Sequence, residues 1–177
     1  MSAATNTMPL AADMASQPAF SLELAYRAHA QDVLRTAYRI TGRMADAEDV
    51  LQTVFLRLSA RPPAGVENVE GYLRRAAVNA ALDTLRSRST WGEVELPETI
   101  ASPSSAFEAA HIRDSLRRAM LQLSPRAAEV FVLRFVEGHD NREIARMLKT
   151  SAAVIAVLLH RTRRQLQKEL RGRERGR

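Results

Sequence analysis

Helix-start signals at short intervals constrain the second half of this chain more than any other feature. Ser124 places a capping hydroxyl directly before Pro125, a residue suited to the first turn of a helix. Asp140 and Glu143 have the spacing of a capping box, and Ser151 supplies a further cap soon afterwards. This punctuation predicts a short helix, a turn of a few residues and a longer helix, the pattern of a helix-turn-helix.

Residues 46–58 carry apolar side chains at helical spacing. One face of the predicted helix collects Ala47, Val50, Leu51, Val54, Phe55 and Leu58. The opposite face carries Leu56 between Asp49 and Gln52. An apolar side chain flanked by polar groups is typical of a partner contact. Single exposed leucines are also common on ordinary surfaces, so the pattern leaves both interpretations open.

The helix predicted from Gly71 to Arg88 has a buried face of Leu73, Ala77, Ala81 and Leu85. Its opposite face gathers Arg75, Asn79 and Arg86, with Asp83 at the edge. Arginine and asparagine together suit contacts to phosphates and bases. The alternative is a solvated stripe that is held by a local pair, either Asp83 with Arg86 or Asn79 with Asp83.

Composition and punctuation predict an all-α protein of two small helical domains. Apolar residues make up 46% of the chain and aromatic residues 5%, and glycine and proline are sparse. The two helical blocks span residues 20–88 and 107–171. Residues 89–106 between them are rich in serine and proline and contain glutamate without any basic residue, which predicts an extended acidic linker. We expect a disordered N-terminus over residues 1–19 and a basic tail over residues 172–177.

The chain's positive charge is concentrated at its C-terminus. Residues 160–177 contain eight Arg or Lys against two Glu, so this segment alone carries the +6 net charge of the whole chain. A cationic end on a neutral body indicates a polyanionic partner. A solvated helix end would give the same pattern, and charge alone does not separate the two.

The last helix, predicted from residue 152 to 170, is apolar at its start and basic afterwards. Its buried face contains Ala152, Ile155, Leu159, Thr162, Leu166 and Leu170, whereas Ala153, Val154, Val157, His160, Arg161, Arg164 and Lys168 face outward. The second helix of a helix-turn-helix places its N-terminal part against base edges. Here that part is apolar, so it can contact thymine methyl groups but cannot hydrogen-bond a base.

Other function classes find little support in the sequence. There is no cysteine, and the N-terminal residues lack the pattern of a signal peptide. No apolar stretch reaches the length of a membrane span. The four histidines are scattered, and no metalloprotease, phosphate-loop or catalytic-triad motif occurs. An enzyme is therefore the least expected class, and we expect no cofactor, metal, small-molecule substrate or membrane insertion.

Three motifs in order resemble a known family. DAEDVLQTVFLRL (46–58), GYLRRAAVNAALDTLR (71–86) and the segment from Leu121 to Leu166 resemble bacterial RNA polymerase sigma factors of the sigma-70 family, in the extracytoplasmic-function (ECF) group. The resemblance covers nearly all of residues 20–170. It implies a cytoplasmic protein that directs core RNA polymerase to promoters and performs no chemistry itself.

The first motif resembles the segment of sigma factors that grips the clamp helices of the polymerase β′ subunit. The resemblance therefore implies a core-polymerase-binding set of Asp46, Asp49, Gln52, Phe55 and Leu56. The second block resembles the module that docks on the polymerase β flap. The acidic linker would pass through the nucleic-acid channel of the polymerase.

The second motif resembles the part of sigma factors that opens and reads the promoter −10 element as a single strand. It implies that Arg74, Arg75, Asn79 and Arg86 contact −10 DNA, and that the proline-rich loop at 61–68 captures a flipped base.

The helix-turn-helix resembles the module that reads the −35 element as a duplex. The implied −35 contacts are Arg142, Ser151, Ala153, Val154, Val157, His160, Arg161 and Arg164. Members of the family commonly carry polar or basic residues where this chain has Val154, Ala156, Val157 and Leu158. We hypothesise that the polar and basic members of the set hold phosphates or flanking bases, while thymine methyls or duplex shape supply selectivity.

Three alternatives to a sigma factor stay open at the level of sequence. A helix-turn-helix regulator of duplex DNA would explain residues 121–177 but not the motifs at 46–86. An interaction protein could bind polymerase or another regulator without reading DNA. An amphipathic helix on an anionic membrane surface would also combine basic and apolar faces. The resemblance adds an anti-sigma protein as a further partner, although no residue points to one.

Overall fold

The computed structural model describes residues 20–61, 68–90 and 104–175, and all regular structure within these ranges is helical. The helices are α1 (Leu22–Thr41), α2 (Met44–Ala60), α3 (Val69–Thr90), α4 (Ser104–Leu121), α5 (Pro125–Phe135), α6 (Asn141–Met147) and α7 (Ala152–Arg175). The all-α prediction is confirmed. The predicted N-terminus (1–19) lies outside the described residues, as do residues 62–67 of the predicted loop and residues 91–103 of the predicted linker. The ends of that linker, residues 89–90 and 104–106, are helical and belong to α3 and α4.

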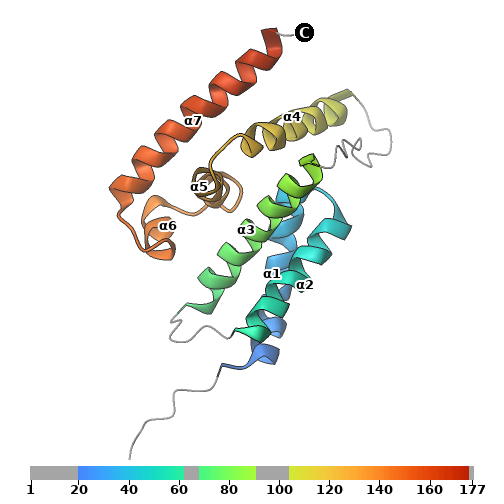
Figure 1. The fold of residues 1–177 in the computed structure, drawn as a ribbon, viewed down its shortest axis with the longest axis vertical. Helices are drawn as coiled ribbons and strands as arrows, with labels where there is room; N and C mark the ends of the chain where they lie inside the picture. The colour runs from blue at the N-terminus through green and yellow to red at the C-terminus, as the bar shows by residue number, and fades with distance from the viewer. Residues whose placement is uncertain (1–19, 62–67, 91–103, 176–177) are drawn as a thin grey trace, which may run out of the picture.

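Helices α1, α2 and α3 pack against one another as a first bundle (Figure 1). The predicted stripe of α2 is confirmed, because its apolar residues are buried except Leu51, which is partly exposed. The apolar face of α3 is buried as well, and Leu73 and Leu82 are almost wholly enclosed. Packing of these faces, more than helix propensity, holds the bundle together.

Helices α4 to α7 form the second bundle, and the predicted capping signals start α5, α6 and α7. The Ser124 hydroxyl accepts a hydrogen bond from the Ala127 amide at 3.3 Å, and Pro125 opens α5. Asp140 Oδ1 accepts from the Glu143 amide at 2.8 Å, while Glu143 Oε2 accepts from the Asp140 amide at 2.8 Å. This capping box fixes the start of α6.

The helix-turn-helix prediction is confirmed. Helix α6 is followed by a turn over residues 148–151 and then by the long helix α7. The predicted inner face of α7 packs on α4, α5 and α6, with Ile155, Leu159, Thr162 and Leu166 buried. The Thr162 hydroxyl donates to the Leu158 carbonyl at 2.8 Å, which satisfies this polar group inside the core.

The two bundles pack directly on each other. Helix α3 lies against α4, α5 and α6, on the side away from α7 (Figure 1). At one end of this contact, Arg117 of α4 donates from Nε to the Ile40 carbonyl of α1 at 2.9 Å. Its guanidinium lies over Gly42, whose φ of 77° ends α1 in the left-handed region. Burial lowers the pKa of Arg117 below its ordinary value.

Within the described parts of the chain, no helix combines the length and the apolarity that a bilayer span requires.

Candidate polymerase and nucleic-acid interface

The outer face of α2 presents three of the five residues predicted to bind polymerase. Asp49, Gln52 and Leu56 are exposed along one side of the helix, and the Leu56 residue keeps 67% of its surface open to solvent. Spacings of three and four residues place them on adjacent turns. The predicted partner surface therefore exists as an apolar side chain with an acid and an amide on preceding turns.

The other two residues of the predicted set are turned inward. Phe55 is buried and packs edge-to-face against Tyr26 of α1, with ring centroids 4.9 Å apart. Asp46 forms an ion pair with Arg88 at the end of α3, with 2.5 Å between Oδ2 and Nη1. These two side chains fix α2 against α1 and α3, and so position the exposed face.

Three of the four predicted −10 residues of α3 lie between the two bundles. Arg74, Arg75 and Asn79 are partly buried and point toward the second bundle. Arg86, three turns from Arg75, forms an ion pair with Asp83 at 3.0 Å on its own helix. The local ion pair that the solvated-stripe alternative predicts is therefore present between Asp83 and Arg86. The other three residues contact partners far along the chain.

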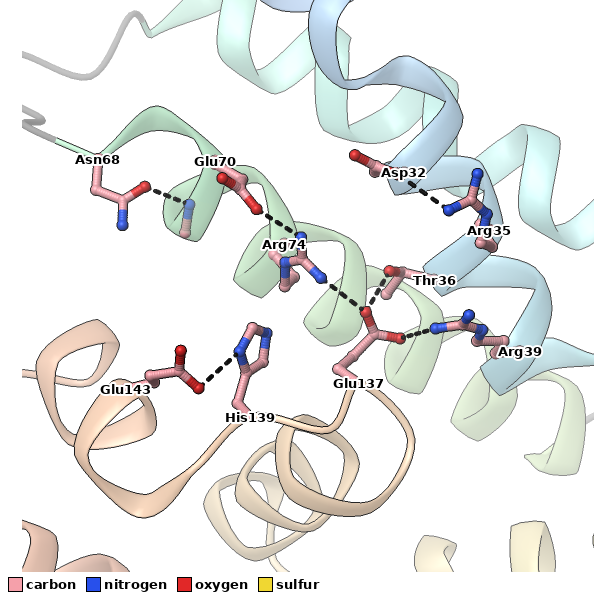
Figure 2. A network of polar contacts seen from close by, with 11 residues as sticks. Asp32, Arg35, Thr36, Arg39, Asn68, Glu70, Arg74, Glu137, His139 and Glu143 are labelled. Atoms are coloured by element: carbon pink, nitrogen blue, oxygen red, sulfur yellow. Dashed lines mark hydrogen bonds and ion pairs between the residues drawn. The ribbon is translucent and has the colours of Figure 1, made fainter.

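Two glutamates of the second bundle receive these side chains. Asn79 Nδ2 donates to Glu129 Oε1 at 3.1 Å, and Arg75 Nε donates to the same oxygen at 3.0 Å. Arg74 donates from Nη1 to Glu137 Oε2 at 3.3 Å and from Nη2 to Glu70 at 2.7 Å (Figure 2). The group predicted to meet DNA phosphates is therefore engaged with carboxylates.

Sequence reasoning missed Glu129 and Glu137. Glu129 stands in the apolar run AAEVFVL of α5, where a charged residue on a buried face is unusual. That local contradiction was a usable signal that the carboxylate has a partner. Nothing in the neighbouring sequence of Glu137, just past the end of α5, signals its partners on α1 and α3.

The predicted −35 residues lie together on the outer side of the helix-turn-helix. All eight of them are exposed: Arg142, Ser151, Ala153, Val154, Val157, His160, Arg161 and Arg164. Val154 and Val157 each expose about half of their surface, and with Ala153, Leu158 and Arg161 they line a shallow hollow. The apolar start and basic continuation of the helix thus form one continuous surface.

Local electrostatics fix the start of this surface. The Glu143 amide, followed by the Arg142 amide, holds the pKa of Asp140 below its ordinary value of 3.8, so the cap is ionised at neutral pH. The Ser151 hydroxyl accepts from the Val154 amide at 3.2 Å and caps α7. The hydroxyl proton of Ser151 can still be donated to a phosphate.

Comparison with known proteins identifies the family. Residues 25–90 match the model of sigma-70 region 2, and residues 113–166 match a model of sigma-70 region 4, which together make up more than half of the chain. The RNA polymerase sigma-E factor of Streptomyces avermitilis is 31% identical, over 91% of each chain. The chain belongs to the ECF group of the sigma-70 family.

Other relatives are longer than this ECF family member. The ECF RNA polymerase sigma factor SigE of Mycolicibacterium smegmatis is 31% identical over 88% of the chain and 63% of that protein. The probable ECF RNA polymerase sigma factor SigI of Mycobacterium tuberculosis is 32% identical over 80% of the chain and 53% of that protein. The chain therefore spans less than two thirds of either relative.

A solved structure shares the fold of this ECF family member. The sigma factor RpoE from Bartonella quintana, crystallised with the anti-sigma factor NepR, superposes with a TM-score of 0.50 at 17% identity, covering 84% of this chain and 96% of that one.

Proposed function

We propose that this ECF family member binds core RNA polymerase and directs promoter recognition and transcription initiation at a restricted set of genes. The observation that carries the proposal is the occurrence of both sigma-70 regions, in order, on one chain with an exposed partner face on α2 and a helix-turn-helix. The chain supplies binding and positioning, while the polymerase performs the chemistry. Its site of action is the cytoplasm, where polymerase meets the promoter.

The polymerase contact uses the outer face of α2. Leu56 enters an apolar pocket between the β′ clamp helices, and Asp49 and Gln52 hydrogen-bond around it, as in the centre and rim of a typical interface. Asp46 and Phe55 support this face through their contacts with Arg88 and Tyr26. The second bundle docks on the β flap.

The −10 contact uses the face of α3 that carries Arg74, Arg75 and Asn79, with Arg86 further along the helix. Guanidinium groups bind phosphate oxygens through parallel hydrogen bonds, and an asparagine amide can pair with a base edge. A strand opened by polymerase exposes such edges, and a base flipped out of the stack can be bound by the protein. For this contact, the face of α3 must be separated from Glu129 and Glu137.

The −35 contact uses the surface of α7. Ala153, Val154 and Val157 approach thymine methyl groups in the major groove, while Arg142, Arg161 and Arg164 hold flanking phosphates, with Ser151 and His160. Direct hydrogen-bonded base readout is replaced by methyl contacts and by duplex shape. An anti-sigma protein, such as the one bound to the Bartonella quintana neighbour, is the partner we propose for control.

The test of this proposal measures binding of the purified chain to core polymerase and to duplex DNA alone. A sigma factor should bind core polymerase and should bind promoter duplex tightly only as part of that complex. Tight duplex binding without polymerase, and no binding to polymerase, would favour a simple helix-turn-helix regulator. Polymerase binding without promoter complexes would favour an interaction protein.

A further inference from the structure

The contact between the bundles is built around two carboxylates that belong to the second bundle and are enclosed by the first. The Glu129 side chain exposes 5% of its surface, and the Glu137 side chain exposes 1%. An ionised carboxylate at such depth needs several charged or polar partners, because burial removes its hydration. Both glutamates find partners on the opposite bundle.

Glu137 is held by α1 and α3. The Thr36 hydroxyl donates to Oε2 at 2.8 Å, and Arg74 Nη1 donates to the same oxygen at 3.3 Å. Arg39 Nη1 lies 3.6 Å from Oε1 (Figure 2). A hydroxyl and two guanidinium groups converging on one anion resemble a phosphate-binding site, and here the anion is a side chain of the same molecule.

Glu129 is held in a similar way. Its Oε1 accepts from Arg75 and Asn79 of α3, and its Oε2 accepts from Arg126 Nη1 of its own helix at 3.0 Å. Arg75 also donates from Nη1 to the Met147 carbonyl of α6 at 3.0 Å. The guanidinium of Arg75 is therefore engaged by both α5 and α6.

The carboxylates and a DNA strand compete for the same side chains. Arg74, Arg75 and Asn79 are three of the four residues assigned to −10 DNA under the proposed function, on which this inference rests. All three donate hydrogen bonds to Glu129 or Glu137. By contrast, Leu56 on α2 and the outward face of α7 remain exposed in the same structure. Closure thus covers the single-strand surface and leaves the polymerase and duplex surfaces accessible.

We propose that Glu129 and Glu137 act as an intramolecular substitute for DNA phosphates, holding the two bundles closed and preventing single-stranded DNA from binding until the bundles separate. Polymerase can dock on α2 while the two bundles are closed, and separation of the bundles then exposes the face of α3. The apparent affinity of free protein for a single strand equals the intrinsic affinity multiplied by the fraction of molecules that are open. A closed state populated at about 90% therefore weakens binding about tenfold.

The test uses the full chain without polymerase and a fluorescein-labelled, single-stranded oligonucleotide of random sequence. The double variant E129Q/E137Q keeps the shape of both side chains and removes their charges. Its matched control, E23Q/E48Q, changes the net charge equally at two exposed positions. We expect the first variant to bind the strand about tenfold more tightly and the control to bind within about twofold of the unaltered chain.

A second readout reports closure itself. The chain lacks cysteine, so Gln31→Cys in α1 and Gln167→Cys in α7, both exposed, accept a pair of fluorescent labels. Energy transfer should fall in E129Q/E137Q and should stay unchanged in E23Q/E48Q. Thr36→Val removes one donor to Glu137 without altering charge, so it should also lower energy transfer, by less than E129Q/E137Q does.

The outcomes separate this inference from the proposed function. Unchanged energy transfer in both E129Q/E137Q and Thr36→Val would refute closure by the glutamates and leave the promoter-binding proposal intact. Reduced energy transfer without tighter strand binding would mean that α3 is not the single-strand surface. That result would refute both the −10 assignment and the proposal that closure prevents strand binding. An equal gain in affinity for the strand in E129Q/E137Q and E23Q/E48Q would mean that net charge alone causes the effect, and it would overturn the inference.

Discussion

Truncation of one exposed leucine should separate polymerase binding from stability. Leu56 exposes 67% of its surface on α2, so the change Leu56→Ala removes little that the folded chain buries. Surface substitutions of this kind usually change the free energy of unfolding by less than about 0.5 kcal/mol. We therefore expect an unaltered melting temperature and a clear loss of affinity for core polymerase.

The size of the loss follows from the exposed surface. Full burial of a leucine side chain is worth about 1.5–3 kcal/mol, and about two thirds of the Leu56 surface is available for a partner to cover. Docking should thus gain about 1–2 kcal/mol from this residue. That range corresponds to a dissociation constant about 5- to 30-fold higher in the variant.

The assay is a titration of fluorescently labelled chain with core polymerase. Leu24 of α1 provides a matched control, because it is also 67% exposed and Leu24→Ala deletes the same atoms outside α2. Leu58→Ala, at a fully buried position of α2, should instead cost about 2–5 kcal/mol of stability. Equal affinity of the Leu56 variant and the unaltered chain would refute the docking surface, and so would equal losses at Leu24 and Leu56.

Three further predictions concern local geometry. Gly42→Ala should lower the melting temperature more than Gly138→Ala. Both glycines have φ near 80°, but only at Gly42 would an added methyl group meet the Arg117 side chain. Equal decreases in melting temperature, measured by calorimetry, would mean that Arg117 of α4 does not pack on Gly42. Asp140→Ala should lower thermal stability at neutral pH. The depressed pKa means that the stabilisation is present above pH 3.8 and is lost as the pH falls through the folded value, so thermal unfolding at several pH values should show the difference closing in acid. Val157→Lys should change promoter preference in transcription from a mixed template pool, whereas an unaltered preference would exclude this residue from −35 readout.

Local signals made most of the fold predictable. The caps at Ser124 and Asp140 act over a few residues, and the apolar stripe of α2 repeats with the period of one helix, so a single stretch of sequence carries each of them. The exposed Leu56 was likewise visible as an apolar residue on a polar face. Element boundaries were less certain, since α4 begins at Ser104, three residues before the expected start of the second block.

The contact between the bundles could not be derived in the same way. Arg75 meets Glu129 across 54 residues of sequence, and Thr36 meets Glu137 across 101 residues. No periodicity links such positions, because their pairing depends on how two finished bundles approach. The sequence indicated that the polar stripe of α3 has an anionic partner but not that the molecule itself can provide the anion.

Run-off transcription with purified core polymerase and a genomic fragment library as template is the decisive experiment for promoter recognition by this chain. We expect discrete transcripts that appear only when this chain is added. Their upstream sequences should align at a −10 element and, because α7 contacts thymine methyl groups, at a −35 element. Absence of such transcripts, with a known sigma factor active in the same reaction, would contradict promoter recognition by this chain.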